Sequence, residues 1–337
     1  MKKKSLVVTA LAATLLLTGL SASRVYGARA IDFTQAASIT VGLSDTNQYE
    51  ELTENEIHVT FTQIASMDEN GEYTSDYIDV KNITDSTTAA SWIAMAEEAA
   101  GKDLKGAYQT TVVMTDGNTA TARIPGEHFG LYLMQVDAFE TEEYSYTFAN
   151  AIVAVPGNNY YSYDADGNPV AGEDDAWIYQ VSTVLKPEYD TLTGDVTIHK
   201  SLDTYNMSLS ETSFVFKVTA YKDYSAVDRE LGRQLVYSNL ATLTFNEAGA
   251  DELTIEGIPA GAEVTIEEVY SGATYKLVSD RVQNVVIDNH ETAVVTFENT
   301  YDDTLEGNGT AIVNTFYYMK NNDGVTGSWN WTNYLNY

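Results

Sequence analysis

Apolar and polar residues alternate in short runs along most of the chain, and this period of two predicts β-strands. In the first half, Val59 and Phe61 illustrate the pattern, because successive side chains of a strand point to opposite faces and these two share one face. Turn sequences at 68–71 and 116–118 separate such runs. The runs predicted to form strands here are 38–43, 57–64, 120–124, 130–138, 144–155 and 177–185.

One segment of the first half has helical spacing instead. Residues 88–100 are rich in alanine and carry Trp92 on the same face as smaller apolar residues. Asp85 and Ser86 stand before this segment as a cap, and Gly101 follows it as a stop signal. We therefore expect one helix in a crossover between strands, packed on the sheet through Trp92.

The second half repeats the β pattern in seven short runs with regular turns, which is typical of an immunoglobulin-like sandwich. A segment rich in Gly, Asn and Asp at 156–176, predicted to be a long loop or an extended hairpin, and a short linker at 186–190 precede it. The chain is therefore predicted to be all-β, with two tandem immunoglobulin-like or prealbumin-like β-sandwiches, the first carrying the crossover helix. Their predicted boundaries are 31–186 and 191–302. The strand runs of the second are 194–200, 214–221, 241–245, 252–258, 263–270, 275–278 and 293–300.

The first thirty residues have the order of a secretory signal peptide. Lysines at positions 2–4 precede an apolar core at 6–20, and small residues follow around two candidate cleavage sites, 25–27 and 28–30. The apolar run is too short for a stable membrane anchor. We therefore expect residues 1–30 to be removed on export, leaving a secreted or cell-surface protein without membrane insertion.

The composition excludes several classes of partner. The chain has 49 acidic and 18 basic residues, and five of the basic ones fall within the predicted signal peptide. So acidic a mature chain would repel nucleic acid and anionic lipid. Cysteine is absent although export would permit disulfides, which indicates either a chain that simply avoids cysteine or another kind of covalent staple.

The sequence does not indicate the chemistry of the familiar enzyme classes. The four histidines, at 58, 128, 199 and 290, are scattered without metal-ligand spacing. Residues 164–168 look like a fragment of a calcium loop but lack its closing Glu, so a tight Asp-Gly turn is the preferred interpretation. No nucleophile-histidine-acid pattern or phosphate loop occurs. We predict no enzymatic activity, no metal and no cofactor.

Three polar residues occupy positions that the alternation of the second half assigns to the core. Lys200, Glu268 and Asn299 continue the apolar faces of its first, fifth and last runs, respectively. A buried lysine and a buried glutamate are costly unless they serve each other, and a salt bridge is one solution. The other solution is covalent, since burial lowers the pKa of an amine and raises that of a carboxylic acid, which favours a neutral nucleophile beside a proton donor.

The carboxamide of Asn299 is the group that such an amine would attack. Proton transfer through Glu268 would release ammonia and leave an amide bond between the first and last strands of the second domain. Phenylalanines of the neighbouring runs supply the apolar shell that this chemistry needs. Glu267 is the alternative for the assisting acid, although its phase along the strand points it outward.

A set of five short segments surrounds these residues: Val196–Lys200, Phe214–Val218, Ile258–Ala262, Val264–Glu268 and Val295–Tyr301. This set resembles the pilin isopeptide-linkage domains of Gram-positive bacteria, which are related to Cna B-type modules. The resemblance implies an intramolecular isopeptide bond between Lys200 and Asn299, assisted by Glu268. It covers the second predicted domain and extends no further along the chain.

The first half resembles the prealbumin-like N-terminal domains of secreted pilin subunits in the pattern of its segments 38–43, 130–136, 149–156 and 177–181. No lysine occupies its opening strand, so a second bond of the same type is not expected. Lys186 lies near the position where such subunits carry the acceptor lysine for sortase polymerisation, which makes it a candidate acceptor. Lys186 precedes a proline, whereas the acceptor lysine of the family follows one. The alternative interpretation is that Lys186 is a linker lysine exposed to solvent.

These features predict an exported cell-surface structural or adhesive protein, a pilin-like subunit, with other pilin or surface subunits as partners and a host protein or glycan as a further candidate ligand. The alternative is a secreted carbohydrate- or host-protein-binding module that does not polymerise. The tail at 303–337 lacks the usual wall-sorting pattern. Its strand-like run at 310–318 is expected to pair with the second domain or a neighbouring subunit, and Trp329 and Trp331 could stack on a glycan or pack on the sandwich.

Overall fold

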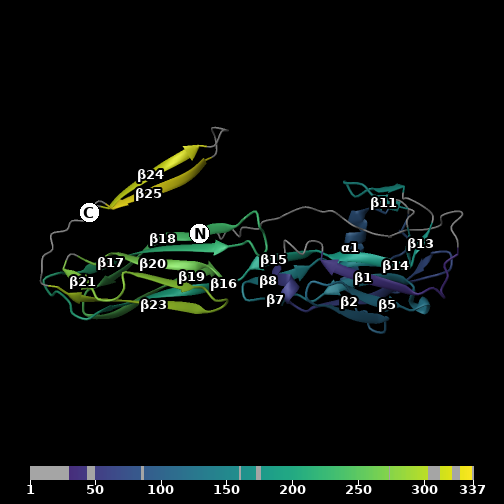
Figure 1. Cartoon of the computed structure of the whole chain (residues 1–337), viewed down its shortest axis with the longest axis horizontal. Coiled ribbons are helices and arrows are strands. Elements are labelled where there is room, and N and C mark those ends of the chain that lie inside the picture. The colour runs from purple at the N-terminus through teal and green to yellow at the C-terminus, as the bar shows by residue number, and fades with distance from the viewer. Residues whose placement is uncertain are drawn as a thin grey trace.

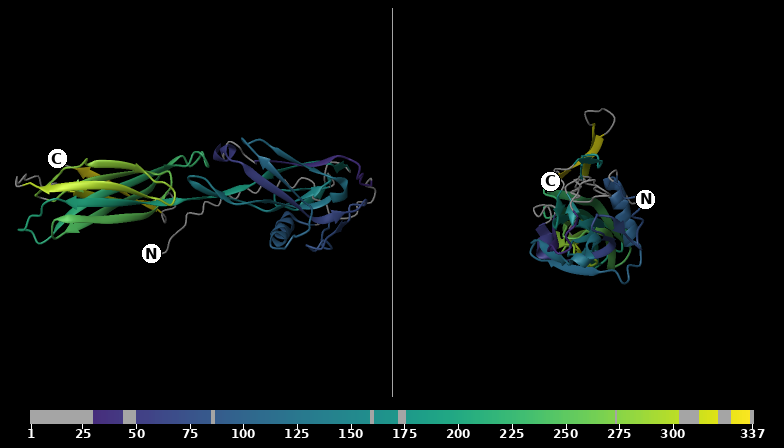
Figure 2. Two further views of the ribbon diagram at one scale, coloured as in Figure 1. Left: turned by 90° about the horizontal axis from the view of Figure 1, so that it is seen from below. Right: turned by 90° about the vertical axis from the view of Figure 1, so that its right-hand side faces the viewer.

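The computed structural model describes residues 30–43, 50–84, 87–158, 161–171, 176–272, 274–302, 312–320 and 327–335. The predicted signal peptide lies outside them, apart from its last position. The described residues form two β-sandwiches in tandem, the first with an α-helix, which confirms the predicted fold class. Figures 1 and 2 show the sandwiches end to end along the long axis. Within the described ranges no helix is long and apolar enough to cross a bilayer, and no group of acidic residues and histidines is arranged to hold a metal ion.

The first sandwich contains many short strands and two short 3-10 helices, η1 (Glu50–Glu54) and η2 (Gly126–His128). Its larger sheets have the orders β3-β2-β6-β9, with β4 on β2, then β14-β1-β5 and β15-β8-β7. Two further pairs are β10-β13 and β11-β12. The strands are β1 (Ala37–Leu43), β2 (Ile57–Met67), β3 (Tyr73–Thr74), β4 (Gln109–Met114), β5 (Ala120–Ile124), β6 (Gly130–Val136), β7 (Phe139–Glu140), β8 (Tyr144–Phe148), β9 (Ala151–Val155), β10 (Gly157–Asn158), β11 (Tyr161–Tyr163), β12 (Pro169–Ala171), β13 (Trp177–Ile178), β14 (Gln180–Leu185) and β15 (Pro187–Thr191).

The helix α1 (Ala89–Ala100) covers the face of the β2-β6-β9 sheet that points away from the main core. Its Trp92 is fully buried there among residues such as Leu131 and Ile152, which confirms the predicted packing. The predicted cap residues, 85 and 86, lie outside the described residues, and the helix is capped by Thr88. Thr88 has an extended backbone immediately before the first helical residue, and its side chain accepts the Ser91 N–H at 3.2 Å, so it lies in the position that caps the first turn.

Two predictions about strand boundaries in the first half are wrong. The run 144–155 forms two strands, because the chain leaves β8 and enters β9 in a different sheet after an interruption at Ala149 and Asn150. The segment 186–190 is not a linker, since β15 pairs along its whole length with β8. β4, which pairs with the first part of β2, was not among the predicted strands.

The second sandwich has two four-stranded sheets, β19-β16-β23-β21 and β18-β17-β20-β22. Their inward side chains form one hydrophobic core, in which strand β17 has every second residue buried. The first strand of this sandwich, β16, runs parallel to its last, β23. The strands are β16 (Thr193–Leu202), β17 (Thr212–Asp223), β18 (Arg233–Phe245), β19 (Gly249–Pro259), β20 (Glu263–Tyr270), β21 (Tyr275–Leu277), β22 (Val282–Val286) and β23 (Thr292–Tyr301).

The tail contains a β-hairpin of β24 (Ile312–Lys320) and β25 (Gly327–Leu335). The strand predicted near 310–318 therefore exists, but its pairing partner is β25 rather than a strand of the second sandwich. β25 contains Trp329 and Trp331.

Candidate functional site

Three strands of the second sandwich bring the predicted polar residues together. Lys200 on β16 and Asn299 on β23 belong to neighbouring parallel strands, in which Leu202 is the residue directly opposite Asn299. Glu268 comes from β20 in the facing sheet, so it reaches the pair across the core. All three residues are fully buried. The alternation that predicted inward positions for Lys200, Glu268 and Asn299 therefore holds in the fold.

The three side chains form a closed triangle of polar contacts. Lys200 Nζ donates a hydrogen bond to Asn299 Oδ1, and Asn299 Nδ2 donates one to Glu268 Oε1 at 2.7 Å. Lys200 Nζ and Glu268 Oε2 form an ion pair at 3.4 Å. The carboxylate thus has one oxygen beside the amine that would attack and the other beside the NH2 group that would leave.

Aromatic residues surround this triangle. Lys200 Nζ lies 4.6 Å from the centroid of the Phe214 ring, and the rings of Phe216 and Phe297 pack with their centroids 5.0 Å apart. Burial in this shell lowers the pKa of Lys200 from 10.5 to about 8, although the negative charges of Glu268 and Glu298 oppose the shift. The neutral amine, which is the nucleophilic form, is therefore much more accessible here than on a solvated lysine.

The structure distinguishes the two candidates for the assisting acid. Glu267 lies on the opposite face of β20 and is only partly buried, opposite Lys217 of β17 in the ladder. Glu268 points into the core and contacts both Lys200 and Asn299. The geometry thus brings together Lys200, Glu268 and Asn299 and leaves Glu267 outside the triangle.

Lys186, the candidate sortase acceptor, lies between β14 and β15 and is not part of the triangle. It is half-buried rather than extended into solvent, and this partial burial lowers the pKa of its amine. Because β15 pairs with β8, Lys186 belongs to an ordered strand junction and not to a linker.

A second buried lysine, Lys222, was not identified from the sequence. Lys222 is fully buried and continues the inward face of β17, two positions beyond Ala220. The same alternation could have found it, because the buried positions of β17 are every second residue up to and including Lys222. Its partner is Glu143 of the first sandwich, and no local pattern indicates a contact between residues so far apart in the sequence.

Comparison with known proteins adds the following. Residues 196–302 match a family model described as a domain of unknown function, DUF5979. No curated protein matches the chain. Among solved structures, the chain is similar to a streptococcal ancillary pilin, with 16% identity over 87% of this chain and 75% of that one and a TM-score of 0.26. It is also similar to GBS52, the minor pilin of Streptococcus agalactiae, with 13% identity over 80% of this chain and 97% of that one and a TM-score of 0.24. A third similar structure is the shaft pilin SpaA of Lactobacillus rhamnosus GG. Its sequence identity is 14%, the match covers 80% of this chain and 100% of that one, and the TM-score is 0.25. At these identities and scores the likeness bears on neither ligand nor partner.

Proposed function

We propose that this chain is an exported cell-surface structural protein, a pilin-like subunit, whose second sandwich is cross-linked by an autocatalytic isopeptide bond between Lys200 and Asn299. The observation that carries the proposal is the closed, fully buried triangle of an amine, a carboxamide and a carboxylate. An ion pair alone would not need the carboxamide, and a buried ion pair is a weak source of stability.

In the proposed reaction, Glu268 Oε2 takes a proton from Lys200 Nζ, and the neutral amine attacks Asn299 Cγ. A C–N bond forms, and the attacking nitrogen loses its second proton as the tetrahedral carbon expels the amide nitrogen, which receives a proton from the Glu268 carboxyl group. The products are the Lys200–Asn299 amide and ammonia, which leaves with the remaining proton as an ammonium ion, so Glu268 ends as the carboxylate that it was at the start. The apolar shell favours each neutral species in this sequence.

The position of the bond suits a protein that carries tension. Lys200 lies near the end of β16, and Asn299 lies near the end of the parallel β23. Tension entering at the start of β16 would pass to Lys200, cross the bond and leave from Asn299 toward Tyr301. The residues between Lys200 and Asn299, which are 99 positions apart in the sequence, would carry no load.

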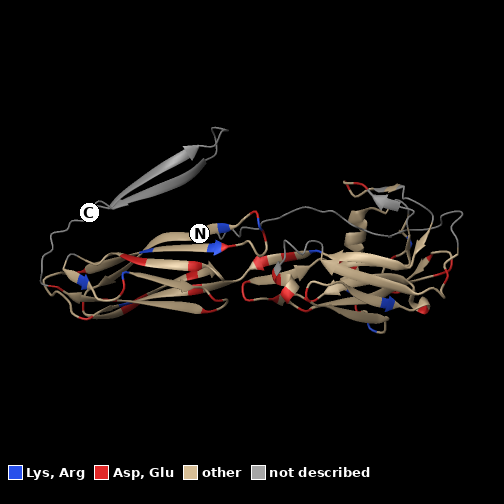
Figure 3. Cartoon of the chain, viewed as in Figure 1, with Lys and Arg blue, Asp and Glu red and all other residues tan. Residues whose placement is uncertain are grey.

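The same role accounts for the charge and the predicted partners. Acidic residues are spread over both sandwiches (Figure 3), so other pilin or surface subunits are more suitable partners than nucleic acid. Lys186 is the proposed acceptor if a sortase joins such subunits. Apart from the self-reaction, the protein has no enzymatic role in this proposal, and it requires no cofactor.

The intact mass of the purified mature protein tests the bond. We expect a mass one ammonia below that of the sequence, and a linked peptide containing Lys200 and Asn299 after digestion. Lys200→Ala and Asn299→Ala should have their full sequence masses, whereas Lys276→Ala, a control at an exposed position on β21, should keep the deficit. A wild-type protein of full mass would refute the cross-link.

Immunoblots of surface extracts from the native organism test the pilin-like role separately. A polymerised subunit gives a ladder of high-mass bands, and Lys186→Arg should abolish it if Lys186 is the acceptor. A single band at the monomer mass would instead support a binding module that does not polymerise.

A further inference from the structure

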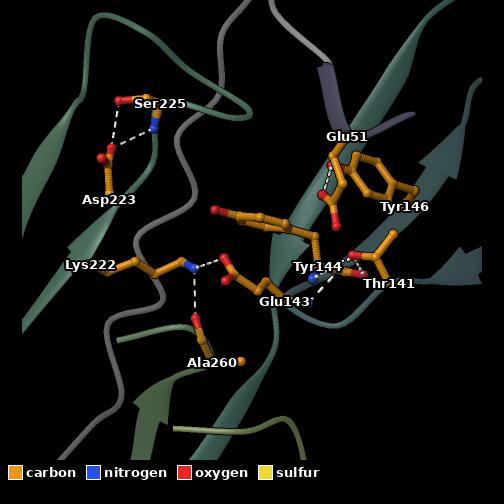
Figure 4. A network of polar contacts seen from close by, with 9 residues as sticks. All are labelled: Glu51, Thr141, Glu143, Tyr144, Tyr146, Lys222, Asp223, Ser225 and Ala260. Atoms are coloured by element: carbon orange, nitrogen blue, oxygen red, sulfur yellow. Dashed lines mark hydrogen bonds and ion pairs between the residues drawn. The ribbon is translucent and has the colours of Figure 1, made fainter. Parts of the chain in front are cut away.

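The two sandwiches meet at an ion pair between a fully buried lysine and a partly exposed glutamate (Figure 4). Lys222, close to the end of β17 in the second sandwich, extends its side chain to Glu143 in the turn between β7 and β8 of the first. Lys222 Nζ lies 2.5 Å from Glu143 Oε2 and donates a second hydrogen bond to the Ala260 carbonyl oxygen at 2.6 Å. The Lys222 side chain is fully buried, whereas that of Glu143 keeps 38% of its surface exposed. A charge buried this completely is costly unless its partners remain in place.

Two aromatic rings complete the surroundings of the lysine, one from each sandwich. Lys222 Nζ lies 4.7 Å from the centroid of the Tyr144 ring and 5.5 Å from that of Tyr224. Tyr144 belongs to β8, and Tyr224 follows β17. Cation-π attraction strengthens when the cation is removed from water, so both rings favour the position in which the sandwiches are in contact.

The loop between β17 and β18 also contributes to the hydrophobic core of the first sandwich. Val227 is fully buried and packs within that core, although its own strands belong to the second. Backbone contacts tighten the same junction, since Leu192 N–H donates to the Glu143 carbonyl oxygen at 2.9 Å. The core of the first sandwich is therefore completed by a residue from its neighbour.

Gly261 makes this close approach sterically feasible. Its φ is +74°, and a Cβ atom at this position would lie 2.1 Å from Glu143 Oε1. Any other residue here would be strained in its backbone and would push the Glu143 carboxylate away from Lys222.

We infer that Glu143, Tyr144, Lys222, Tyr224 and Val227 form an interdomain joint that holds the two sandwiches in one fixed alignment. The chain then behaves as one rigid segment rather than as two bodies joined by a tether. This inference is independent of the cross-link, because the joint shares no residue with the Lys200 triangle and would exist with or without the covalent bond.

The distance between spin labels on the two sandwiches tests the joint directly. The protein has no cysteine, so cysteines introduced at Ile93 of α1 and Val294 of β23, which are 47% and 59% exposed, would be the sole labelling sites. Pulsed electron resonance on the otherwise wild-type mature chain should give one narrow distance distribution. Lys222→Met should broaden this distance distribution and remove its single maximum. The substitution removes the positive charge that attracts the Glu143 carboxylate and the rings of Tyr144 and Tyr224.

A matched control and a second variant complete this test. Lys105→Met makes the same substitution at a lysine that is 91% exposed, and it should leave the distribution narrow. Glu143→Gln removes the negative partner of the same ion pair. Because Glu143 is partly exposed, this variant should fold and decides the result if Lys222→Met does not. A broad distribution in the labelled protein without further substitution, or a narrow one in folded Lys222→Met or Glu143→Gln, would overturn the inference.

Discussion

Asn299→Ala is the most informative single substitution in the proposed cross-link, because it removes the carbon atom that the lysine attacks and leaves Lys200 and Glu268 to pair as ions. Lys200 and Asn299 are 99 positions apart, so their bond closes a loop of about 100 residues. In the loop-entropy model that describes disulfides, such a closure stabilises the fold by about 4–5 kcal/mol. The variant should therefore lose at least this much of the free energy of unfolding of the second sandwich.

Calorimetry and denaturant titration on the same mass-verified samples measure this loss. For a domain of this size the melting temperature should fall by roughly 15–40 °C. The dependence of the unfolding free energy on urea should become steeper, because an unfolded chain without the cross-link exposes more surface. Glu267→Ala, one position away on the outer face of β20, should change stability by only about 0.5 kcal/mol.

The two readouts separate the covalent effect from ordinary damage to the core. Loss of polar contacts around Asn299 would lower the melting temperature but leave the urea dependence unchanged. If the variant melts within a few degrees of a wild-type protein that does carry the ammonia deficit, the loop-entropy reasoning is wrong. An unchanged urea dependence would lead to the same conclusion.

Three further predictions follow from the geometry. In Asn299→Ala, Lys200 remains a buried amine with a pKa of about 8 against 10.5 in an exposed chain, so the folded state binds fewer protons between these values. Its stability to urea should therefore rise as the pH increases from about 8 to 10, whereas a wild type whose Lys200 nitrogen is part of the proposed amide should lack this rise. When the mature chain is pulled by its ends in a force microscope, Asn299→Ala should release about 330–350 Å of length that the wild type retains, and an equal release from the wild type would contradict the cross-link. Thr88→Ala removes the oxygen that accepts the Ser91 N–H, and thermal melting should show a loss of about 0.5–2 kcal/mol in the first sandwich.

The sequence located the three residues of the triangle because strand alternation is a local property. Each of Lys200, Glu268 and Asn299 continues an apolar face, and a period of two is enough to show this. The parallel pairing of β16 with β23 is a tertiary feature, and here the resemblance to isopeptide-linkage domains, rather than the pattern, indicated that Lys200 and Asn299 would meet. The same alternation extends to Lys222, but its partner Glu143 belongs to the other sandwich and has no signal in the pattern.

The errors in strand boundaries have equally physical origins. Alternation does not reveal which strand a segment will pair with, so the change of sheet between β8 and β9 was invisible in the run 144–155. The segment 186–190 begins with Lys-Pro and is rich in charge, and its local pattern does not reveal that it pairs with β8. Pro187 lacks an N–H, yet it is the first residue of β15 at the edge of its sheet, where a missing donor is tolerated.

The two buried lysines of the second sandwich suit different mechanical tasks. Only Leu192 separates β15 from β16, so tension from the first sandwich passes along the main chain directly into the strand that carries Lys200. The proposed permanent bond at that point would resist stretching. Bending is different, because it would separate Lys222 from Glu143 without loading the main chain, and a partly exposed ion pair can open and close again. In a rod built from such chains, the proposed bond at Lys200 would make the second sandwich resist stretching, while the stiffness against bending between the sandwiches would depend on Lys222.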